Sequence, residues 1–281
     1  MSQVAIIGAS GMLGTDLCTQ LESDGYTLHP FNSKTLDICN DTIVSDTLSN
    51  IGPLDFVINC AAFTAVDECE TQEDRAHAVN ADGAKHIATY CQTNAIPFIH
   101  FSTDYVFDGN STEPYLETDT PTPINVYGQS KWRGEQAIQN SGCNAYIFRV
   151  QAVFGKNGPH FMKAIQQLAQ TKDSIDVVSD QFTSPTSTLS ISKMISAVIK
   201  NSPPFGLYHF RNQGSCHWAE YAQFIMDETK HTTTIKTCDS TAFPRPAKRP
   251  KNAILNCDKF NQLACYTPPH WQDDVRTYLS T

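Results

Sequence analysis

Short apolar runs alternate with amphipathic stretches along the first half of the chain. A short apolar run predicts a buried strand, and apolar residues three or four positions apart predict a helix with one buried face. Strands are expected at residues 4–7, 26–31, 56–60, 96–101 and 145–150. Helices are expected at 12–23, 41–50 and 124–140, and between the acidic stretch 66–74 and residue 93. This alternation is typical of a parallel sheet covered by helices.

The pattern is more interrupted after residue 150. Helical spacing and short apolar runs continue, but Pro185, the Pro203–Pro204 pair and Gly206 break them. Such interruptions favour connecting loops over a repeating strand–helix array. We therefore predict an α/β protein whose doubly wound parallel sheet occupies residues 1–150. Residues 151–281 would form a smaller lobe, with segments that return to the core.

Composition and charge narrow the possible functions. Apolar residues make up 40% of the chain and charged residues 17%, which is typical of a globular protein. A net charge of -9 argues against non-specific nucleic-acid binding, which requires a basic surface. Ten cysteines occur without a Cys-x-x-Cys pair, and no signal peptide or transmembrane run is recognisable. We expect a cytoplasmic protein with reduced thiols and no membrane contact.

A glycine-rich loop follows the first expected strand. Gly8, Gly11 and Gly14 stand between that strand and a helix. Gly8 permits a tight turn, Gly11 allows the backbone to approach a pyrophosphate, and Gly14 allows close packing of the helix on the strand. Phosphates would then bind at the helix N-terminus. The motif predicts a Rossmann-type, NAD(P)-binding domain at residues 1–150.

The cofactor choice depends on the end of the second strand. An NAD site usually offers a carboxylate there, but the chain has none until Asp37. Lys34 is suited to a 2′-phosphate, which favours NADP(H), although it is equally consistent with a solvated loop lysine. NAD(H) stays open as the alternative cofactor.

Two further motifs suggest reductase chemistry. Tyr127 and Lys131 are four residues apart on an expected helix, so they share one face. A nearby ammonium lowers the pKa of a tyrosine, which otherwise titrates too high for acid–base work at neutral pH. Thr103 stands at the carboxyl end of an expected central strand, where open α/β sheets bind ligands. Its hydroxyl is suited to hold a substrate carbonyl, or alternatively to cap the turn.

Taken together, the motifs resemble the extended short-chain dehydrogenase/reductases and, within them, the dTDP-4-dehydrorhamnose reductase family. The resemblance covers nearly the whole chain. It rests on the glycine loop, on segments 60–67, 102–109 and 123–131, and on segments 180–186, 206–209 and 249–252. It implies that Tyr127 protonates the C4 oxygen of a nucleotide-linked 4-keto-6-deoxy sugar while a nicotinamide delivers hydride. Lys131 would bind the nicotinamide ribose.

The motifs and the resemblance together define the expected site. The cofactor is expected at Gly8, Ser10, Gly11, Met12, Leu13, Gly14, Lys34, Asp37, Ile38, Ala61, Ala62, Phe63, Thr64, Ser102, Tyr127 and Lys131. The substrate is expected at Thr103, Asp104, Tyr105 and Ala152, with residues 151–281 mainly a substrate-binding lobe. No metal site is predicted, because acids such as Asp67 and Glu70 are explained as helix N-terminal residues.

Two departures leave other functions open. The family usually has a tryptophan where this chain has Ala152, and a serine where it has Ala253. Phe154 or Phe182 could supply the missing aromatic wall. The Arg249–Ala253 segment also resembles the regulatory β subunit of methionine adenosyltransferase, which implies an NADP-binding partner protein without turnover. A reductase or epimerase of another nucleotide sugar is the third possibility, and a homodimer is left open as the assembly.

Overall fold

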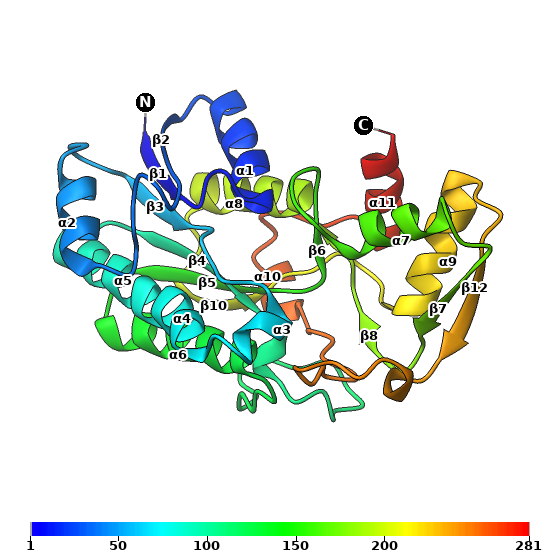
Figure 1. Cartoon of the computed structure of the whole chain (residues 1–281). Coiled ribbons are helices and arrows are strands. Elements are labelled where there is room, and N and C mark those ends of the chain that lie inside the picture. Colours follow the sequence, from blue (N-terminus) through cyan, green and yellow to red (C-terminus); the bar gives the residue numbers. More distant parts are fainter. Residues whose placement is uncertain (1, 281) are drawn as a thin grey trace.

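The structure, a computed structural model, describes residues 2–280 (Figure 1). Its centre is a six-stranded parallel sheet in the order β10-β5-β4-β3-β1-β2. The strands are β1 (Gln3–Ile7), β2 (Thr27–Phe31), β3 (Phe56–Asn59), β4 (Phe98–Thr103), β5 (Ala145–Val150) and β10 (Gly206–His209). The strand order reverses beside β1, and such a switch point opens a crevice at the carboxyl ends of the strands. The predicted parallel sheet is confirmed.

Helices cover both faces of the sheet because its strands are apolar on both sides. On one face, α1 (Met12–Ser23) and α8 (Thr188–Asn201) pack over a core that includes Leu17 and Ile195. On the other face, α2 (Asp41–Ser49), α5 (Gly83–Thr93) and α6 (Val126–Ser141) pack over a core that includes Val57 and Ile87. Figure 1 shows these two helical layers on opposite sides of the sheet.

The segment between β3 and β4 is more irregular than the predicted single helix. It consists of α3 (Val66–Cys69), α4 (Glu73–His77), the π-helical turn η1 (Ala78–Asp82) and then α5. A π-helical turn inserts one residue into a helix and is frequent at functional sites. Strand β4 also begins and ends later than predicted, so that Thr103 is its last residue.

A second lobe lies beside the carboxyl ends of the strands, on the right of Figure 1. It contains the helices α7 (Phe161–Ala169), α9 (Trp218–Thr229) and α11 (Trp271–Leu279), and the parallel pair β7 (Ser174–Val178) and β12 (Thr234–Cys238). The remaining short elements are η2 (Asp104–Val106), β6 (Val153–Phe154), β8 (Phe182–Thr183), β9 (Thr186–Ser187), β11 (Cys216–His217), η3 (Ser240–Ala242) and α10 (Asp258–Asn261).

The lobe has its own apolar core, built around Ile165, Tyr221 and Trp271. Helix α8 and strand β10 also follow residue 150, but they pack with the sheet. All ten cysteines carry free thiols. None of the helices between residues 2 and 280 combines the length and the apolar character needed to cross a bilayer.

Candidate active site

The glycine loop forms the turn between β1 and α1. Gly8 has a φ of +80°, and a Cβ at this residue would lie 2.6 Å from the Ala61 nitrogen. A side chain at Gly14 would collide with the Gly8 carbonyl, so α1 packs directly on the turn. In the described chain no side chain caps the N-terminus of α1, which begins after Gly11. Its first backbone N–H groups, those of Met12 and Leu13, are therefore available to an anion.

A cleft of about 340 Å³ lies beside this loop, above the carboxyl ends of β1 and β3. Of the residues predicted at the cofactor, it is lined by Gly8, Ser10, Gly11, Asp37, Ile38, Ala61, Ala62 and Phe63. Since the cleft lies beside the glycine turn and the helix N-terminus there is uncapped, the cleft fits a dinucleotide. The sequence did not indicate Asn32, Ser33 or Arg75, which also line it.

Lys34, Thr64 and Ser102 are not among the residues that line the cleft. Lys34 is exposed, and its backbone nitrogen donates to Asn32 Oδ1 at 2.9 Å in a local turn. The buried Ser102 hydroxyl donates to Glu135 of α6. The cation that lines the cleft is Arg75, whose guanidinium lies 4.6 Å from the centre of the Phe63 ring.

Asn80 of the π-helical turn holds the wall of the cleft in place. Its Oδ1 accepts from the Phe63 nitrogen at 2.8 Å, and its Nδ2 donates to the Phe63 carbonyl at 3.0 Å. The same amide donates to the Ser130 hydroxyl of α6 at 2.9 Å. Asn80 thus connects the cofactor cleft to the helix that carries Tyr127. Sequence reasoning missed it, because only the fold brings these segments together.

The start of α6 determines where Tyr127 lies. Asn125 caps the helix by accepting from the Gly128 nitrogen at 2.7 Å, and Glu70 accepts from the Val126 nitrogen at 2.9 Å. Glu70 therefore docks the acidic segment onto α6, a role more specific than the predicted helix-dipole effect. A side chain at Gly128 would collide with the Tyr105 carbonyl, so the glycine permits α6 to pack against η2.

Thr103, Asp104 and Tyr127 meet at the end of β4. The Thr103 hydroxyl donates to Asp104 Oδ1 at 3.0 Å and lies near the Tyr127 side chain. Burial raises the pKa of Tyr127, and the nearby Thr103 hydroxyl opposes this rise. Burial also raises the pKa of Asp104 to about 7. The predicted Thr103 and Tyr127 hydroxyls thus lie beside a buried carboxyl group whose pKa is about 7.

Lys131 lies one helical turn after Tyr127 and is 2% exposed. Its Nζ donates to the Phe101 carbonyl at 2.6 Å and lies 3.2 Å from Nε2 of His100. Burial lowers the pKa of Lys131 to about 8, and the charge of Glu135 opposes this effect. The expected face shared by Tyr127 and Lys131 is therefore present, but His100 is a neighbour that the sequence did not indicate.

An ion pair connects the sheet domain to the second lobe. Asp67 accepts from Arg249 Nη2 at 2.8 Å, and Arg245 Nη1 lies 3.9 Å from the same carboxylate. Arg249 lies near the Tyr105 side chain, whose ring meets the Tyr127 ring edge to face at 5.8 Å between centroids. The Arg249 guanidinium holds the pKa of Asp67 below its usual range.

A second cavity, of about 420 Å³, opens beyond Tyr105 in the second lobe. Its walls combine Arg245 and Arg249 with aromatic and aliphatic side chains. The aromatic ones are Tyr105, Phe161, Trp218 and Phe243. Neither Phe154 nor Phe182, the substitutes suggested by the sequence, lines this cavity. Phe154 is buried against His160 and Tyr278, and Phe182 is exposed beside His217.

Ala152, predicted at the substrate, does not line the cavity either. It has a φ of +42°, a conformation that is uncommon for residues other than glycine. Its carbonyl accepts from the Thr186 nitrogen at 3.2 Å, which ties the end of β5 to β9.

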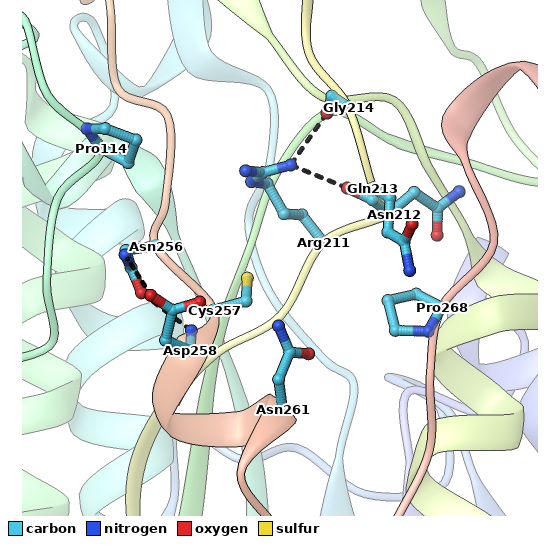
Figure 2. Close-up of a pocket in the computed structure, with 10 residues that line it drawn as sticks. All are labelled: Pro114, Arg211, Asn212, Gln213, Gly214, Asn256, Cys257, Asp258, Asn261 and Pro268. Carbon is cyan, nitrogen blue, oxygen red and sulfur yellow. Dashed lines mark hydrogen bonds between the residues drawn. The ribbon is translucent and has the colours of Figure 1, made fainter. Parts of the chain in front are cut away.

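Figure 2 shows a separate cavity of about 200 Å³ beyond β10, between residues 211–214 and α10. The Arg211 guanidinium donates there to the carbonyls of Asn212 and Gly214 at 2.9 and 2.8 Å and so organises its own loop. None of the predicted site residues lines this cavity. In the part of the chain that the structure describes, no three His, Cys, Asp or Glu side chains converge as a metal site.

Comparison with solved structures places this geometry among known proteins. The dTDP-4-dehydrorhamnose reductase of Bacillus anthracis strain Ames, in complex with NADP, aligns with a TM-score of 0.96 and 34% identity over 100% of this chain and 99% of that one. The Clostridium acetobutylicum dTDP-4-dehydrorhamnose reductase aligns with a TM-score of 0.95 and 34% identity, covering 99% of this chain and 98% of that one.

Sequence relatives agree with the structural ones. The Bacillus subtilis spore coat polysaccharide biosynthesis protein SpsK is 36% identical, over 99% of this chain and 97% of its own length. The Escherichia coli K12 dTDP-4-dehydrorhamnose reductase is 34% identical, with the same coverage of 99% and 97%. The family model described as the RmlD substrate binding domain matches residues 1–281, and the chain therefore belongs to that family.

Proposed function

We propose that the chain is an NADPH-dependent reductase of the C4 keto group of dTDP-4-dehydrorhamnose, with dTDP-L-rhamnose as the product. The observation that carries this proposal is the position of Tyr127 beside Thr103: it shares an apolar cluster with Phe63 of the dinucleotide cleft, and its ring meets that of Tyr105 in the arginine-lined cavity. Both the sequence relatives and the solved structures support it, because full-length matches at 34% identity in each group are dTDP-4-dehydrorhamnose reductases. One of these was solved with NADP.

The cofactor would lie in the cleft beside the glycine loop, with its pyrophosphate at the N-terminus of α1. When bound, NADPH supplies the hydride. Arg75 is the candidate for the 2′-phosphate, because its side chain lines the cleft and no carboxylate lies within ion-pair distance of it in residues 2–280. Its described partner is the neutral Gln72 amide, at 3.0 Å. Lys34 stays a weaker candidate.

The chain's own residues would then move one proton. Thr103 would hold the carbonyl oxygen, and Tyr127 would donate its hydroxyl proton to that oxygen as charge develops on it. Lys131 would hold the nicotinamide ribose and, in its ammonium form, lower the pKa of Tyr127, because a nearby cation favours the phenolate. Thr103 and Asp104 are buried, which would limit the access of bulk water to their side of the carbonyl group.

The nucleotide end of the substrate would occupy the cavity of the second lobe. Arg245 and Arg249 are suited to a diphosphate, because a guanidinium binds phosphate oxygens in pairs. Phe161, Trp218 and Phe243 offer apolar faces to a base. Residues 151–281 would therefore contribute most of the substrate contacts, while α8 and β10 complete the sheet domain.

An assay with the sugar nucleotide tests the proposal. NADPH oxidation is measured with dTDP-4-keto-6-deoxy sugar made in situ with the epimerase, for wild type and Tyr127→Phe. Wild type should turn over, and Tyr127→Phe should lose roughly 10²- to 10⁴-fold in kcat, the range for removing a general acid. The absence of wild-type turnover, or an unimpaired variant, refutes the proposal.

The same preparations distinguish the other candidate functions. A regulatory subunit would bind NADP and a methionine adenosyltransferase without oxidising NADPH, and product analysis would identify a different nucleotide sugar. Ten free thiols favour a cytoplasmic location. A homodimer stays a prediction, for which sedimentation is the measurement.

A further inference from the structure

A continuous chain of buried hydrogen bonds lies behind Lys131. The Ala61 nitrogen donates to Asn59 Oδ1 at 3.0 Å, and Asn59 Nδ2 lies 3.2 Å from His100 Nδ1. His100 Nε2 lies 3.2 Å from Lys131 Nζ, which donates to the Phe101 carbonyl at 2.6 Å. Asn59, His100 and Lys131 are each no more than 2% exposed. The chain therefore runs from the wall of the cofactor cleft to the amine without contact with bulk water.

The direction of each hydrogen bond follows from the first one. Because Asn59 Oδ1 accepts from a backbone N–H, the other end of the amide, a donor, faces His100. Nδ1 of His100 must then accept, so the neutral ring carries its proton on Nε2. That Nε2–H faces Lys131 Nζ. A neutral amine has a lone pair that can accept this proton, whereas an ammonium has none.

We propose that His100 is a positioning residue that donates Nε2–H to Lys131 and so favours the neutral amine of this lysine. Burial already lowers the pKa of Lys131 to about 8, and the Nε2–H of His100 would act in the same direction. This inference rests on the proposed function in one respect. Tyr127 gives away a proton in each turnover, and the Lys131 ammonium would return one to the phenolate and take its own replacement proton from the solvent.

The groups around Lys131 include some that favour its neutral amine and some that favour its ammonium form. The titratable groups that act on it are His100 from β4, Cys60 from the end of β3 and Glu135 from its own helix, on which Tyr127 stands one turn earlier. Glu135 is already engaged by Arg149, whose Nη2 lies 2.6 Å from the carboxylate, so its charge is largely compensated. Burial and the charge of Lys131 hold the pKa of His100 well below its usual value, which keeps the ring neutral.

Nuclear magnetic resonance of the full chain, without cofactor or substrate, tests the inference directly. ¹⁵N shifts of labelled histidine identify the ring tautomer, with the His100 signal assigned by its loss in His100→Gln. ¹³Cε shifts of labelled lysine follow the protonation of Lys131, assigned by their loss in Lys131→Met. We expect a protonated Nε2, an unprotonated Nδ1 and a Lys131 midpoint near pH 8. A protonated Nδ1 with a bare Nε2 overturns the inference.

The substitution Asn59→Asp should reverse the direction of the hydrogen bonds between residue 59, His100 and Lys131, with almost no change in side-chain volume. A carboxylate at residue 59 accepts from Nδ1–H, so Nε2 becomes an acceptor and stabilises the ammonium. The Lys131 midpoint should then rise by about one pH unit or more. His100→Gln, which can keep an N–H donor near Nε2, should leave the midpoint near that of wild type.

The double variant Asn59→Asp/His100→Gln distinguishes two causes of a shifted Lys131 midpoint: a changed His100 tautomer and the direct effect of the added negative charge. If the Asn59→Asp substitution acts through His100, its effect on the Lys131 midpoint should largely disappear in the His100→Gln background. An undiminished shift would mean that the added charge acts alone, and it would overturn the inference. Because these titrations need neither NADPH nor a sugar, they decide the role of His100 even if the proposed reductase activity is absent.

Discussion

The choice between Arg75 and Lys34 gives the sharpest prediction about the cofactor. Arg75 lines the dinucleotide cleft, and its guanidinium lies over the Phe63 ring, 4.6 Å from the ring centre. Lys34 follows a local turn at the end of β2 and is not among the lining residues. Arg75→Ala should therefore weaken the binding of NADP⁺ and spare that of NAD⁺, while Lys34→Ala should affect both equally little.

The expected magnitude follows from the exposure of Arg75. A hydrogen bond to a charged group contributes about 1.5–3 kcal/mol, and solvent screening places an exposed pair at the lower end. Since 1.4 kcal/mol corresponds to a factor of ten, NADP⁺ affinity should fall roughly tenfold. Loss of the contact with Phe63 affects both cofactors alike, so the ratio of their dissociation constants isolates the 2′-phosphate.

Calorimetric titration of the apo protein with NADP⁺ and NAD⁺ measures this ratio. Wild type, Arg75→Ala, Arg75→Lys and Lys34→Ala form the set, and Arg75→Lys should retain much of the preference because it keeps the charge. The assignment to Arg75 is refuted if Lys34→Ala removes the NADP⁺ preference while Arg75→Ala preserves it.

Two further predictions concern the substrate side of the site. Arg249→Lys keeps the charge but loses the paired hydrogen bonds to Asp67. In steady-state kinetics, KM for the sugar nucleotide should therefore rise about tenfold, with little change in kcat. An unchanged KM would contradict a role of Arg249 at the diphosphate. Burial raises the pKa of Asp104 to about 7, well above its value of about 3.9 in an unfolded chain. The folded state therefore binds this proton more tightly, and the free energy of unfolding should fall as pH rises from about 4 to 7. Asp104→Asn should flatten this slope in thermal melts between about pH 5 and 8, and a slope equal to that of wild type would argue against it.

The sequence alone determined the parts of this protein that depend on local chemistry. A strand, a glycine turn and a helix within the first 23 residues predicted the cofactor loop, because a positive φ and a close backbone approach restrict Gly8 and Gly14. The four-residue spacing of Tyr127 and Lys131 predicted a shared helical face in the same way. The order of apolar runs also predicted the parallel sheet, since its strands must be covered on both faces.

Only the tertiary structure decided which distant residues complete the site. Asp67 and Arg249 are 182 positions apart, and the sequence offered each only a local explanation. Arg75 reaches the cofactor cleft because the segment after β3 places it there, whereas Lys34 is not a lining residue although Asn32 and Ser33 of its own turn are. His100 looked like one more residue of a buried strand until α6 placed Lys131 against it. The physical reason is common to all three: hydrogen bonds and ion pairs between segments depend on how helices pack on the sheet, and that packing is set by the whole core.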